Sequence, residues 1–529
     1  MKTIKINKIS RLSVILLTVI SACTVQENPS SGPISSQAIS VVADTQEPGT
    51  KTTLSNVETQ WASEDKIGLF SPQAKATADG TPEVNPVKNV AFTAKTPAKS
   101  STFKGSMYWG DASSKHNFYA YYPYNSGYTG EQTTVPISLP SAQSQSVAGN
   151  TAHIGALDFM VATSLDVTPP GTVNFTFSHV FAMIEFNIVG SGQLTQINLI
   201  GAGPLACEGT INLSQTPGTN SYAITTTSTS DFVSVTLGTG ASLSSTAVSV
   251  YMMLLPGAQS KNMEIALKID GNWKILSKTP PTGGFSRGQK YVISLNSDSA
   301  GWSSTLTDSR DSNVYDLVVI GEQIWMAENL RATKYPNGTA IPTGHDNTAW
   351  SNLTTGAYAV YPYSQISGLE SKEAVIAEYG CLYNWWAAMN GETTSDANPS
   401  GVQGICPAGW HLPSDAEWTK LTSYLGGVNF AGGKMKEIGT THWASPDTEA
   451  TNSSGFSALP GGFRRNTTGS FVAIGDYGYW WSSKESSTNN AWYRRLFSTI
   501  RSVERNYYSK VYGFSVRCVK DFSHSPILQ

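Results

Sequence analysis

Motifs that would indicate hydrolytic catalysis are few in this sequence. The segment Gly284 to Gly288 reads G-F-S-R-G and fits the G-x-S-x-G pattern of a serine nucleophile. Such a nucleophile sits between a strand and a helix, whereas a β pattern follows here, so the motif predicts a turn. None of the seven histidines belongs to an H-E-x-x-H pair. No hydrolase motif therefore stands in a matching context.

Two groups of residues could hold a metal ion. Asp308, Asp311, Asn313 and Asp316 offer oxygens that could line a calcium loop, but the glycine and the terminal glutamate of an EF-hand are missing. An acidic linker between domains is the simpler interpretation. His179 lies in the apolar phase of a strand without a cluster of other ligands nearby, so we predict a core histidine bonded to backbone. We expect no metal and no cofactor.

The N-terminus carries a further candidate for covalent chemistry. A basic segment precedes the apolar run 12–20, which is too short to span a membrane and is typical of a cleaved signal peptide. Residues 20–23, Ile-Ser-Ala-Cys, resemble a bacterial lipobox, which implies removal of residues 1–22 and acylation of Cys23. An ordinary signal peptide that ends near a cysteine is the alternative. Residues 23–40, rich in Ser, Pro, Asn and Gln, are predicted to be a flexible tether.

Composition limits the kind of protein. A chain of 529 residues is too long for one core and should form several domains. The net charge of -3 gives no electrostatic footprint for nucleic acid. Only 14% of residues are charged, while 40% are hydrophobic, which is typical of a folded, exported β protein rather than a disordered one.

One helix can be predicted within residues 405–425. Ser414 and Glu417 have the spacing of a capping box, so a helix should begin at Asp415. Trp418 and Leu421 then fall on one face, and the glycine pair at 426–427 should end the helix.

Residues 38–300 read as strands and turns throughout. Apolar residues keep one parity up to Met183 and the opposite parity from Ile184, as expected for a bulge or a strand buried on both faces. The segment 169–171, Pro-Pro-Gly, is predicted to join two β-sandwiches.

The order of these segments resembles the fimbrillin-like family of Bacteroidales surface lipoproteins. The motifs that carry the resemblance are Lys51-Thr52-Thr53, Trp61 with Asp65-Lys66-Ile67-Gly68-Leu69-Phe70, Phe118-Tyr119-Ala120-Tyr121-Tyr122-Pro123, Phe177-Ser178-His179 with Phe181-Ala182-Met183-Ile184-Glu185-Phe186, and Gly288 with Tyr291-Val292-Ile293. The resemblance implies two tandem transthyretin-like β-sandwiches, at 41–168 and 169–300. It also implies strand exchange with other fimbrial subunits after proteolysis. Well-known members are cut after an arginine, whereas only Lys51 stands in the corresponding place here.

The composition changes after residue 300, where 11 of the 14 tryptophans lie. Residues 301–313 are predicted to be a linker and residues 314–522 a separate domain. The motifs of that domain resemble the major paralogous domain of Fibrobacter: Val314–Trp325 with Met326–Arg331, Tyr379–Asn390, Ile405–Leu421, Gly455–Arg464, Tyr479–Glu485 and Gly513–Asp521. They also look like a distant version of the sulfatase-modifying fold, an α+β C-type-lectin-like scaffold.

This second resemblance also suggests a disulfide. The scaffold places the helix entry beside the final strand, which implies that Cys406 pairs with Cys518 in an oxidising compartment. Cys207 and Cys381 are then left unpaired. The sulfatase-modifying enzymes use two redox cysteines near their last strands, where this chain has only Cys518, so we expect no such activity.

In the C-type-lectin-like scaffold, ligands meet a long irregular loop that corresponds here to Asp476–Trp492. Aromatic rings, carboxylates and amides bind sugars, so the candidate contacts with host or microbial glycans are Trp480, Trp481, Glu485, Asn489, Asn490 and Trp492. Adjacent Trp480 and Trp481 on a strand point to opposite sides, so at least one should be core. The arginine pairs 464–465 and 494–495 are interpreted as solvated strand edges.

We therefore expect an outer-membrane lipoprotein of the cell surface, an adhesin or a pilus-tip component, with the C-terminal domain as its ligand-binding head. One alternative is a carbohydrate-processing enzyme, which would need a second carboxylate near Glu417 or Glu485. The other is a purely structural surface protein.

Overall fold

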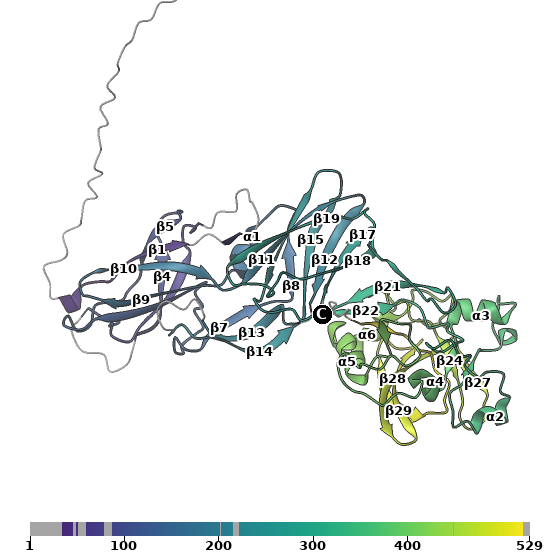
Figure 1. Ribbon diagram of the computed structural model, residues 1–529. Coiled ribbons are helices and arrows are strands. Elements are labelled where there is room, and N and C mark those ends of the chain that lie inside the picture. Colours follow the sequence, from purple (N-terminus) through teal and green to yellow (C-terminus); the bar gives the residue numbers. More distant parts are fainter. Residues whose placement is uncertain are drawn as a thin grey trace, which may run out of the picture.

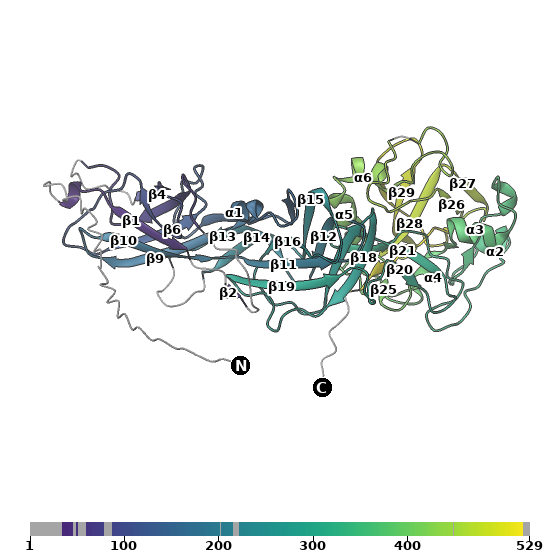
Figure 2. The ribbon, with the colours of Figure 1, turned by 90° about the horizontal axis from the view of Figure 1, so that it is seen from above.

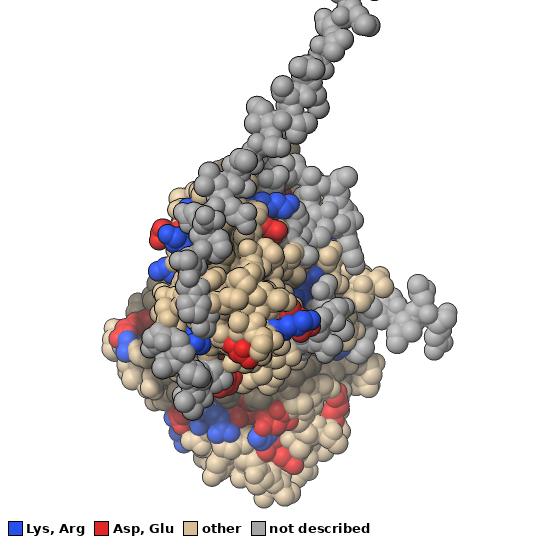
Figure 3. All heavy atoms as spheres, turned by 90° about the vertical axis from the view of Figure 1, so that its left-hand side faces the viewer, with Lys and Arg blue, Asp and Glu red and all other residues tan. Residues whose placement is uncertain are grey.

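Two β domains and a mixed α+β domain follow one another along an elongated molecule (Figures 1 and 2). The computed structural model describes residues 34–45, 49–50, 60–78, 87–201, 203–214, 222–447 and 449–521. The predicted signal peptide, the acylation of Cys23 and the cleavage at Lys51 lie outside these residues. Viewed from the end of the first domain, much of the visible described surface is uncharged, in line with the low content of charged residues (Figure 3).

The first domain is a closed barrel, where a two-sheet sandwich was expected. Its strands follow the order β1-β10-β9-β6-β3-β4-β5. The ring closes because β1 pairs in parallel with β10 and antiparallel with β5. The strands are β1 (Ser40–Thr45), β3 (Lys66–Ser71), β4 (Val87–Ala94), β5 (Ser100–Lys104), β6 (His116–Tyr122), β9 (Met160–Val167) and β10 (Thr172–His179). A short 3-10 helix, η1 (Ile34–Ser36), precedes β1.

The second domain is a sandwich, as expected. A four-stranded sheet contains β16 (Val248–Leu254), β11 (Ala182–Val189), β19 (Gln289–Asn296) and β2 (Gly49–Thr50). A five-stranded sheet contains β18 (Asn272–Lys278), β17 (Met263–Ile269), β12 (Gln193–Ile200), β15 (Phe232–Ser242) and β8 (Ala142–Gln145). Apolar residues from both sheets form one core. A smaller sheet of β14 (Ile224–Ser230), β13 (Ala206–Ile211) and β7 (Val135–Leu139) extends towards the barrel.

The predicted division at residue 168 is wrong, because strand pairing crosses it. Strand β10 belongs to the barrel, while β7 and β8 belong to the second domain, with the short helix α1 (Ala152–Leu157) after them. Residues 169–171 form the turn between β9 and β10 and not a joint between domains. The chain makes its last passage from the barrel to the second domain at Val180 and Phe181, whose side chains pack in a cluster between the two domains.

This passage between domains also explains why the apolar residues switch from odd to even positions after Met183. Phe175 and Phe177 point into the barrel core, whereas Ile184 and Phe186 point into the core of the sandwich. The chain thus passes from one core to another. His179 is buried at this junction, as predicted, but its Nδ1 lies 2.7 Å from a carboxylate oxygen of Asp158 rather than bonding only to backbone.

The third domain, which we call the head, has a five-stranded sheet of β20 (Thr305–Thr307), β21 (Val314–Ile320), β22 (Gln323–Met326), β31 (Val519–Lys520) and β25 (Trp410–His411). Its helices are α2 (Asn347–Ser351), η2 (Tyr363–Gln365), α3 (Lys372–Tyr379), α4 (Trp385–Met389), α5 (Asp415–Tyr424) and α6 (Val428–Met435). Smaller sheets are β23 (Tyr358–Ala359) with β24 (Leu382–Tyr383), β26 (Gly461–Arg464) with β27 (Phe471–Ile474), and β28 (Tyr477–Ser487), β29 (Asn490–Phe497) and β30 (Glu504–Ser509).

Residues 301–313 are part of the fold and not a free linker. Ser303 forms a β-bridge with Ile275 of the second domain, and β20 pairs with β21 of the head. Asp308 is fully buried and forms an ion pair with Arg310, the Oδ2 to Nη2 distance being 2.6 Å. This carboxylate is therefore engaged by a cation of the chain itself. No cluster of three or more metal-ligating side chains occurs among the described residues.

Helix α5 begins and ends where the sequence predicts. The Ser414 hydroxyl accepts a hydrogen bond from the Glu417 amide at 3.1 Å, and the Glu417 carboxylate accepts one from the Ser414 amide at 2.9 Å. Trp418 and Leu421 are completely buried. Gly426 and Gly427 end the helix with φ angles of 99° and 92°, which other residues rarely adopt.

Cys406 and Cys518 are joined by a disulfide between the loop before β25 and the chain just before β31. Cys207 and Cys381 are buried free thiols. Burial raises the pKa of Cys207 to about 11 and that of Cys381 to about 12, so both stay protonated at neutral pH. Among the described residues, no helix has the length and apolar character needed to cross a membrane.

Candidate functional site

The predicted ligand loop is a regular β-hairpin. Strands β28 and β29 pair closely along residues 477–497, with Thr488 and Asn489 at the turn. The expectation of an irregular loop is therefore wrong. Register shifts between Trp481 and Glu485 mark a bulge in β28, after which the strand runs out to the hairpin tip.

Trp480 and Trp481 are both core residues. Each is completely buried, and the indole nitrogens donate hydrogen bonds to Asn329 Oδ1 at 2.8 Å and to the Tyr383 carbonyl at 2.9 Å. The two side chains point to opposite faces of β28, and the fold covers both faces. The assignment of Trp481 as a ligand contact is therefore wrong, as is the same assignment for Trp480.

Glu485, Asn489 and Asn490 lie near the hairpin tip. Glu485 Oε2 lies 2.7 Å from Nζ of Lys510, a side chain only 6% exposed, so this carboxylate neutralises a buried cation. The Asn490 amide donates to the Ser487 hydroxyl at 3.1 Å. Asn489 is exposed. Of these three side chains, Asn489 is the most accessible to a ligand.

Trp492 is half-buried, and one face of its ring is covered. The Arg505 guanidinium lies 3.7 Å from the ring centroid, and the Tyr507 ring meets Trp492 edge to face at 5.3 Å. Arg505 and Tyr507 are both exposed and come from β30. Sequence reasoning missed these two residues because they lie beyond the predicted loop.

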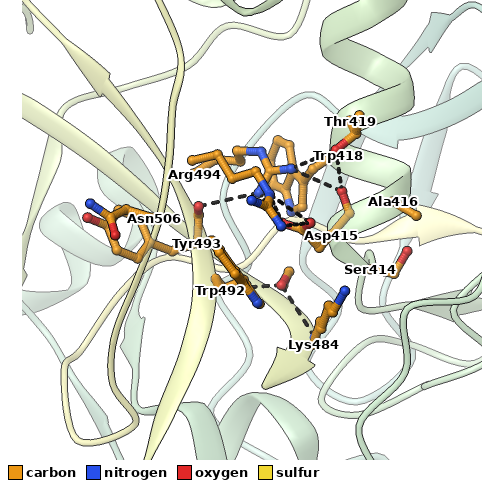
Figure 4. Close-up of polar contacts among 12 residues, drawn as sticks. Ser414, Asp415, Ala416, Trp418, Thr419, Lys484, Trp492, Tyr493, Arg494 and Asn506 are labelled. Atoms are coloured by element: carbon orange, nitrogen blue, oxygen red, sulfur yellow. Dashed lines mark hydrogen bonds and ion pairs between the residues drawn. The ribbon is translucent and has the colours of Figure 1, made fainter. Parts of the chain in front are cut away.

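A buried ion cluster fixes this hairpin to helix α5 (Figure 4). Arg494 reaches from β29 to Asp415, where Nη1 lies 2.5 Å from Oδ1, and its Nη2 donates to the Thr419 hydroxyl at 3.0 Å. Arg505 Nε donates to Asp415 Oδ2 at 2.8 Å. Burial alone would raise the pKa of Asp415, but the two arginines outweigh it and lower that pKa, so the carboxylate stays charged.

The prediction that the arginine pairs are solvated strand edges is wrong for one member of each pair. Arg494 is 1% exposed and Arg464 is 4% exposed. Arg464 Nε donates to the Gly469 carbonyl at 2.7 Å, and its guanidinium lies over the Trp350 ring.

A shallow depression of about 410 Å³ lies beside the hairpin. Its floor includes Thr394, whose hydroxyl accepts a hydrogen bond from the Glu485 amide at 2.8 Å. Lys484 and Asp396 form an ion pair across it. The lining residues are Thr394, Ser395, Asp396, Lys484, Glu485, Ser486, Ser487 and Thr488. Such a polar depression can hold a hydrophilic group.

A second cavity, of about 240 Å³, lies where the second domain meets the head. His411 on its wall is buried between Glu417, with Nε2 to Oε1 at 2.7 Å, and Asp521, with Nδ1 to Oδ1 at 2.6 Å. Burial alone would lower the pKa of His411, but the two carboxylates raise it to about 9. Glu417 also caps helix α5, so this carboxylate is fully engaged.

The geometry defines a class of protein: two β domains in series that present a tryptophan-rich α+β head at one end (Figure 1). Residues 50–310 match the model of the fimbrillin-like family, and residues 318–520 match the Fibrobacter succinogenes major domain. The chain therefore carries a fimbrillin-like region followed by a Fibrobacter succinogenes major domain. The resemblances of the sequence to these two families are thereby confirmed.

Several solved structures match this chain at low sequence identity. A putative cell adhesion protein from Bacteroides uniformis is 14% identical, with a TM-score of 0.35 over 50% of this chain and 94% of that one. A fimbrial protein from Bacteroides ovatus is 12% identical, with a TM-score of 0.25 over 92% of this chain and 100% of that one. A tip fimbrial protein from Porphyromonas gingivalis is 12% identical, with a TM-score of 0.25 over 46% of this chain and 83% of that one. No curated protein matches the sequence.

Proposed function

We propose that this protein is a lipoprotein of the outer membrane, anchored through acylated Cys23, that acts in adhesion or at the tip of a pilus. The fimbrillin-like region serves as the stalk, and the head carries the surface that meets the ligand. The family supports a role at the cell surface with other fimbrial subunits as partners. The protein acts by binding and not by catalysis.

The observation that carries this proposal is that the N-terminal elements and the head lie at opposite ends of the molecule. The first described residues, η1 and β1, lie at the end of the molecule opposite the head (Figure 2). A chain tethered by its N-terminus therefore extends the head away from the membrane. The hairpin β28–β29 and strand β30 lie in that distal domain.

A terminal position follows from the last strand of the fimbrillin-like region. Strand β19 is paired on both sides, with β11 and with β2, and the chain then enters the head sheet through β20. Because β19 is built into its own sheet and followed by a domain, it is unsuited to donation to a neighbouring subunit. The protein thus caps a pilus or stands alone, rather than repeating along a shaft.

Two measurements test the proposal. Mass spectrometry of the protein from its native membrane should find an acylated N-terminal peptide beginning at Cys23, and an unmodified chain that starts elsewhere would contradict the anchor. Immunogold labelling with antibodies against the head should mark fibre ends or the cell surface. Even labelling along the fibres would contradict the terminal position.

A further inference from the structure

Arg505 is an exposed cation with a fixed orientation. Its Nε and Nη2 both lie 2.8 Å from Asp415 Oδ2, and the guanidinium packs on the ring of Trp492. The side chain nevertheless remains 41% exposed. No hydrogen bond of its Nη1 is found among the described residues. An arginine held in this way presents a donor to solvent with little entropy left to lose on binding.

The positive charge at Arg505 is not fully balanced. Two guanidinium groups, those of Arg494 and Arg505, share the single carboxylate of Asp415, which leaves one net positive charge. Arg494 is buried, so this excess faces solvent at Arg505. The neighbouring cations are neutralised, Lys484 by Asp396 and Lys510 by Glu485.

An exposed aromatic ring adjoins this charge. Tyr507 is 48% exposed and lies two residues from Arg505 on β30, so both side chains project from one face. Trp492 is the partner of Tyr507 across the strands, and Asn490 is the partner of Ser509. We call this surface the ribbon face, made up of Asn490, Trp492, Arg505, Tyr507 and Ser509.

We propose that the ribbon face binds an acidic saccharide, with its carboxylate or sulfate group on Arg505 and its ring against Tyr507. The amide of Asn490 and the hydroxyl of Ser509 take the sugar hydroxyls. A charge-assisted hydrogen bond to a fixed arginine is about twice as strong as a neutral one, so the acid group determines which sugar is held. This inference rests on the proposed adhesive function and names the ligand class of the head.

Other anionic partners fit less well. A nucleic acid would require a broad basic surface, whereas the ribbon face carries one excess charge on a chain with a net charge of -3. An acidic peptide would also neutralise Arg505, but it would make little use of the ring and hydroxyl partners together. Binding of such a peptide in preference to sugars is an outcome that overturns the proposal.

The test uses the purified full-length chain. Sialylated and sulfated oligosaccharides are titrated in parallel with the same oligosaccharides after desialylation or desulfation, which separates carboxylate from sulfate recognition. We expect the acidic forms to bind about tenfold or more tightly than the neutral ones. Their affinity should fall as salt rises from about 50 to about 500 mM, because an exposed charge is screened. Equal binding of acidic and neutral forms overturns the proposal.

Variants locate the site. Arg505→Gln should weaken binding of the acidic sugar about tenfold or more, and Tyr507→Ala should weaken it several-fold without touching the contacts of Asp415. The matched control is Arg465→Gln, which removes an exposed arginine beside the separate β26–β27 sheet. Unchanged binding in Arg505→Gln, or an equal loss in Arg465→Gln, overturns the proposal.

The outcomes separate this inference from the proposed function. Cells carrying Arg505→Gln that still adhere like wild type would refute the acidic-sugar site and leave the adhesin intact. Wild-type cells that adhere no better than cells lacking the protein, with the terminal labelling also absent, would refute the proposed function itself.

Discussion

Phe232 of the second domain and Tyr424 of helix α5 pack edge to face across the boundary with the head, with ring centroids 5.7 Å apart and ring planes at 71°. Phe232 is 7% exposed and belongs to the same core cluster as Ile200, Trp273 and Ile275 of its own domain and many residues of the head. Lys520, which is partly exposed, forms an ion pair with the buried Glu264 across the boundary. The head is thus packed on the stalk through a continuous apolar core.

Phe232→Ala should separate the unfolding of the head from that of the second domain. Truncation of a buried phenylalanine lowers the free energy of unfolding by about 3–5 kcal/mol. Here most of the lost contacts are those between the second domain and the head. Calorimetry should show one shared transition in wild type and two resolved transitions in the variant. Phe430→Ala is the control, because Phe430 is 47% exposed on α6 and should cost about 1 kcal/mol or less. An unchanged single transition in Phe232→Ala would contradict the shared core.

Local patterns in the sequence predicted local structure well. Helix α5 follows from Ser414 and Glu417 because a capping box lies within four residues. The domain boundary could not be predicted, since β10 pairs with β1 across more than 120 residues. The sequence of neither strand indicates which distant strand it will pair with. The same limit explains Arg494, whose partner Asp415 is 79 residues away.

The candidate site shows another limit. An alternating strand pattern tells which residues share a face but not whether that face meets solvent or a further layer of the protein. The sequence therefore indicated that at least one of Trp480 and Trp481 is core but not that both are, whereas the head covers both faces of β28 at that point. Further along the ribbon, β29 and β30 leave one face open, and the accessible ring there is Tyr507.

His411 should make stability fall at alkaline pH. Its pKa is raised to about 9 in the folded head from an ordinary value of 6.5, so its contribution is fully present below about pH 6.5 and is lost as pH rises through about 9. The loss is on the order of 3 kcal/mol. Urea unfolding of wild type and His411→Gln at several pH values from 6 to 10 measures it.

The sign and the control decide this test. The difference in unfolding free energy between wild type and His411→Gln should be large at pH 6 and should shrink towards pH 10. The variant keeps every other titrating group of the chain, so the contributions of those groups cancel in this difference. A His411→Gln difference that stays constant over the whole range would mean that the imidazole is not charged in the folded protein.

Cys518→Ser should destabilise the head more than the barrel. The disulfide closes a loop with a sequence separation of 112, for which the chain-entropy model gives about 4–5 kcal/mol. Thermal unfolding followed by tryptophan fluorescence reports mainly on the head, where most tryptophans lie. Cys381→Ser is the control, since that thiol is unpaired. Non-reducing peptide mapping that finds Cys406 and Cys518 as free thiols would contradict the bond.

Substitutions in the hairpin should separate structural residues from accessible ones. Trp481→Ala should cost about 3–5 kcal/mol, because the indole is completely buried and bonded to the Tyr383 carbonyl. Glu485→Ala should cost about 1 kcal/mol, since the carboxylate is 37% exposed and solvent screens its ion pair with Lys510. Asn489→Ala should stay within about 0.5 kcal/mol of wild type.

Adhesion must therefore be compared at matched stability. Wild-type and variant proteins are assayed well below the melting temperature of the least stable variant. The adhesion measured is then that of folded protein in each case. Under these conditions Trp481→Ala should retain adhesion in proportion to its folded fraction, because Trp481 touches no ligand. Complete loss of adhesion by folded Trp481→Ala protein, with Tyr507→Ala behaving as wild type, would move the binding surface from the ribbon face to the interior side of the hairpin.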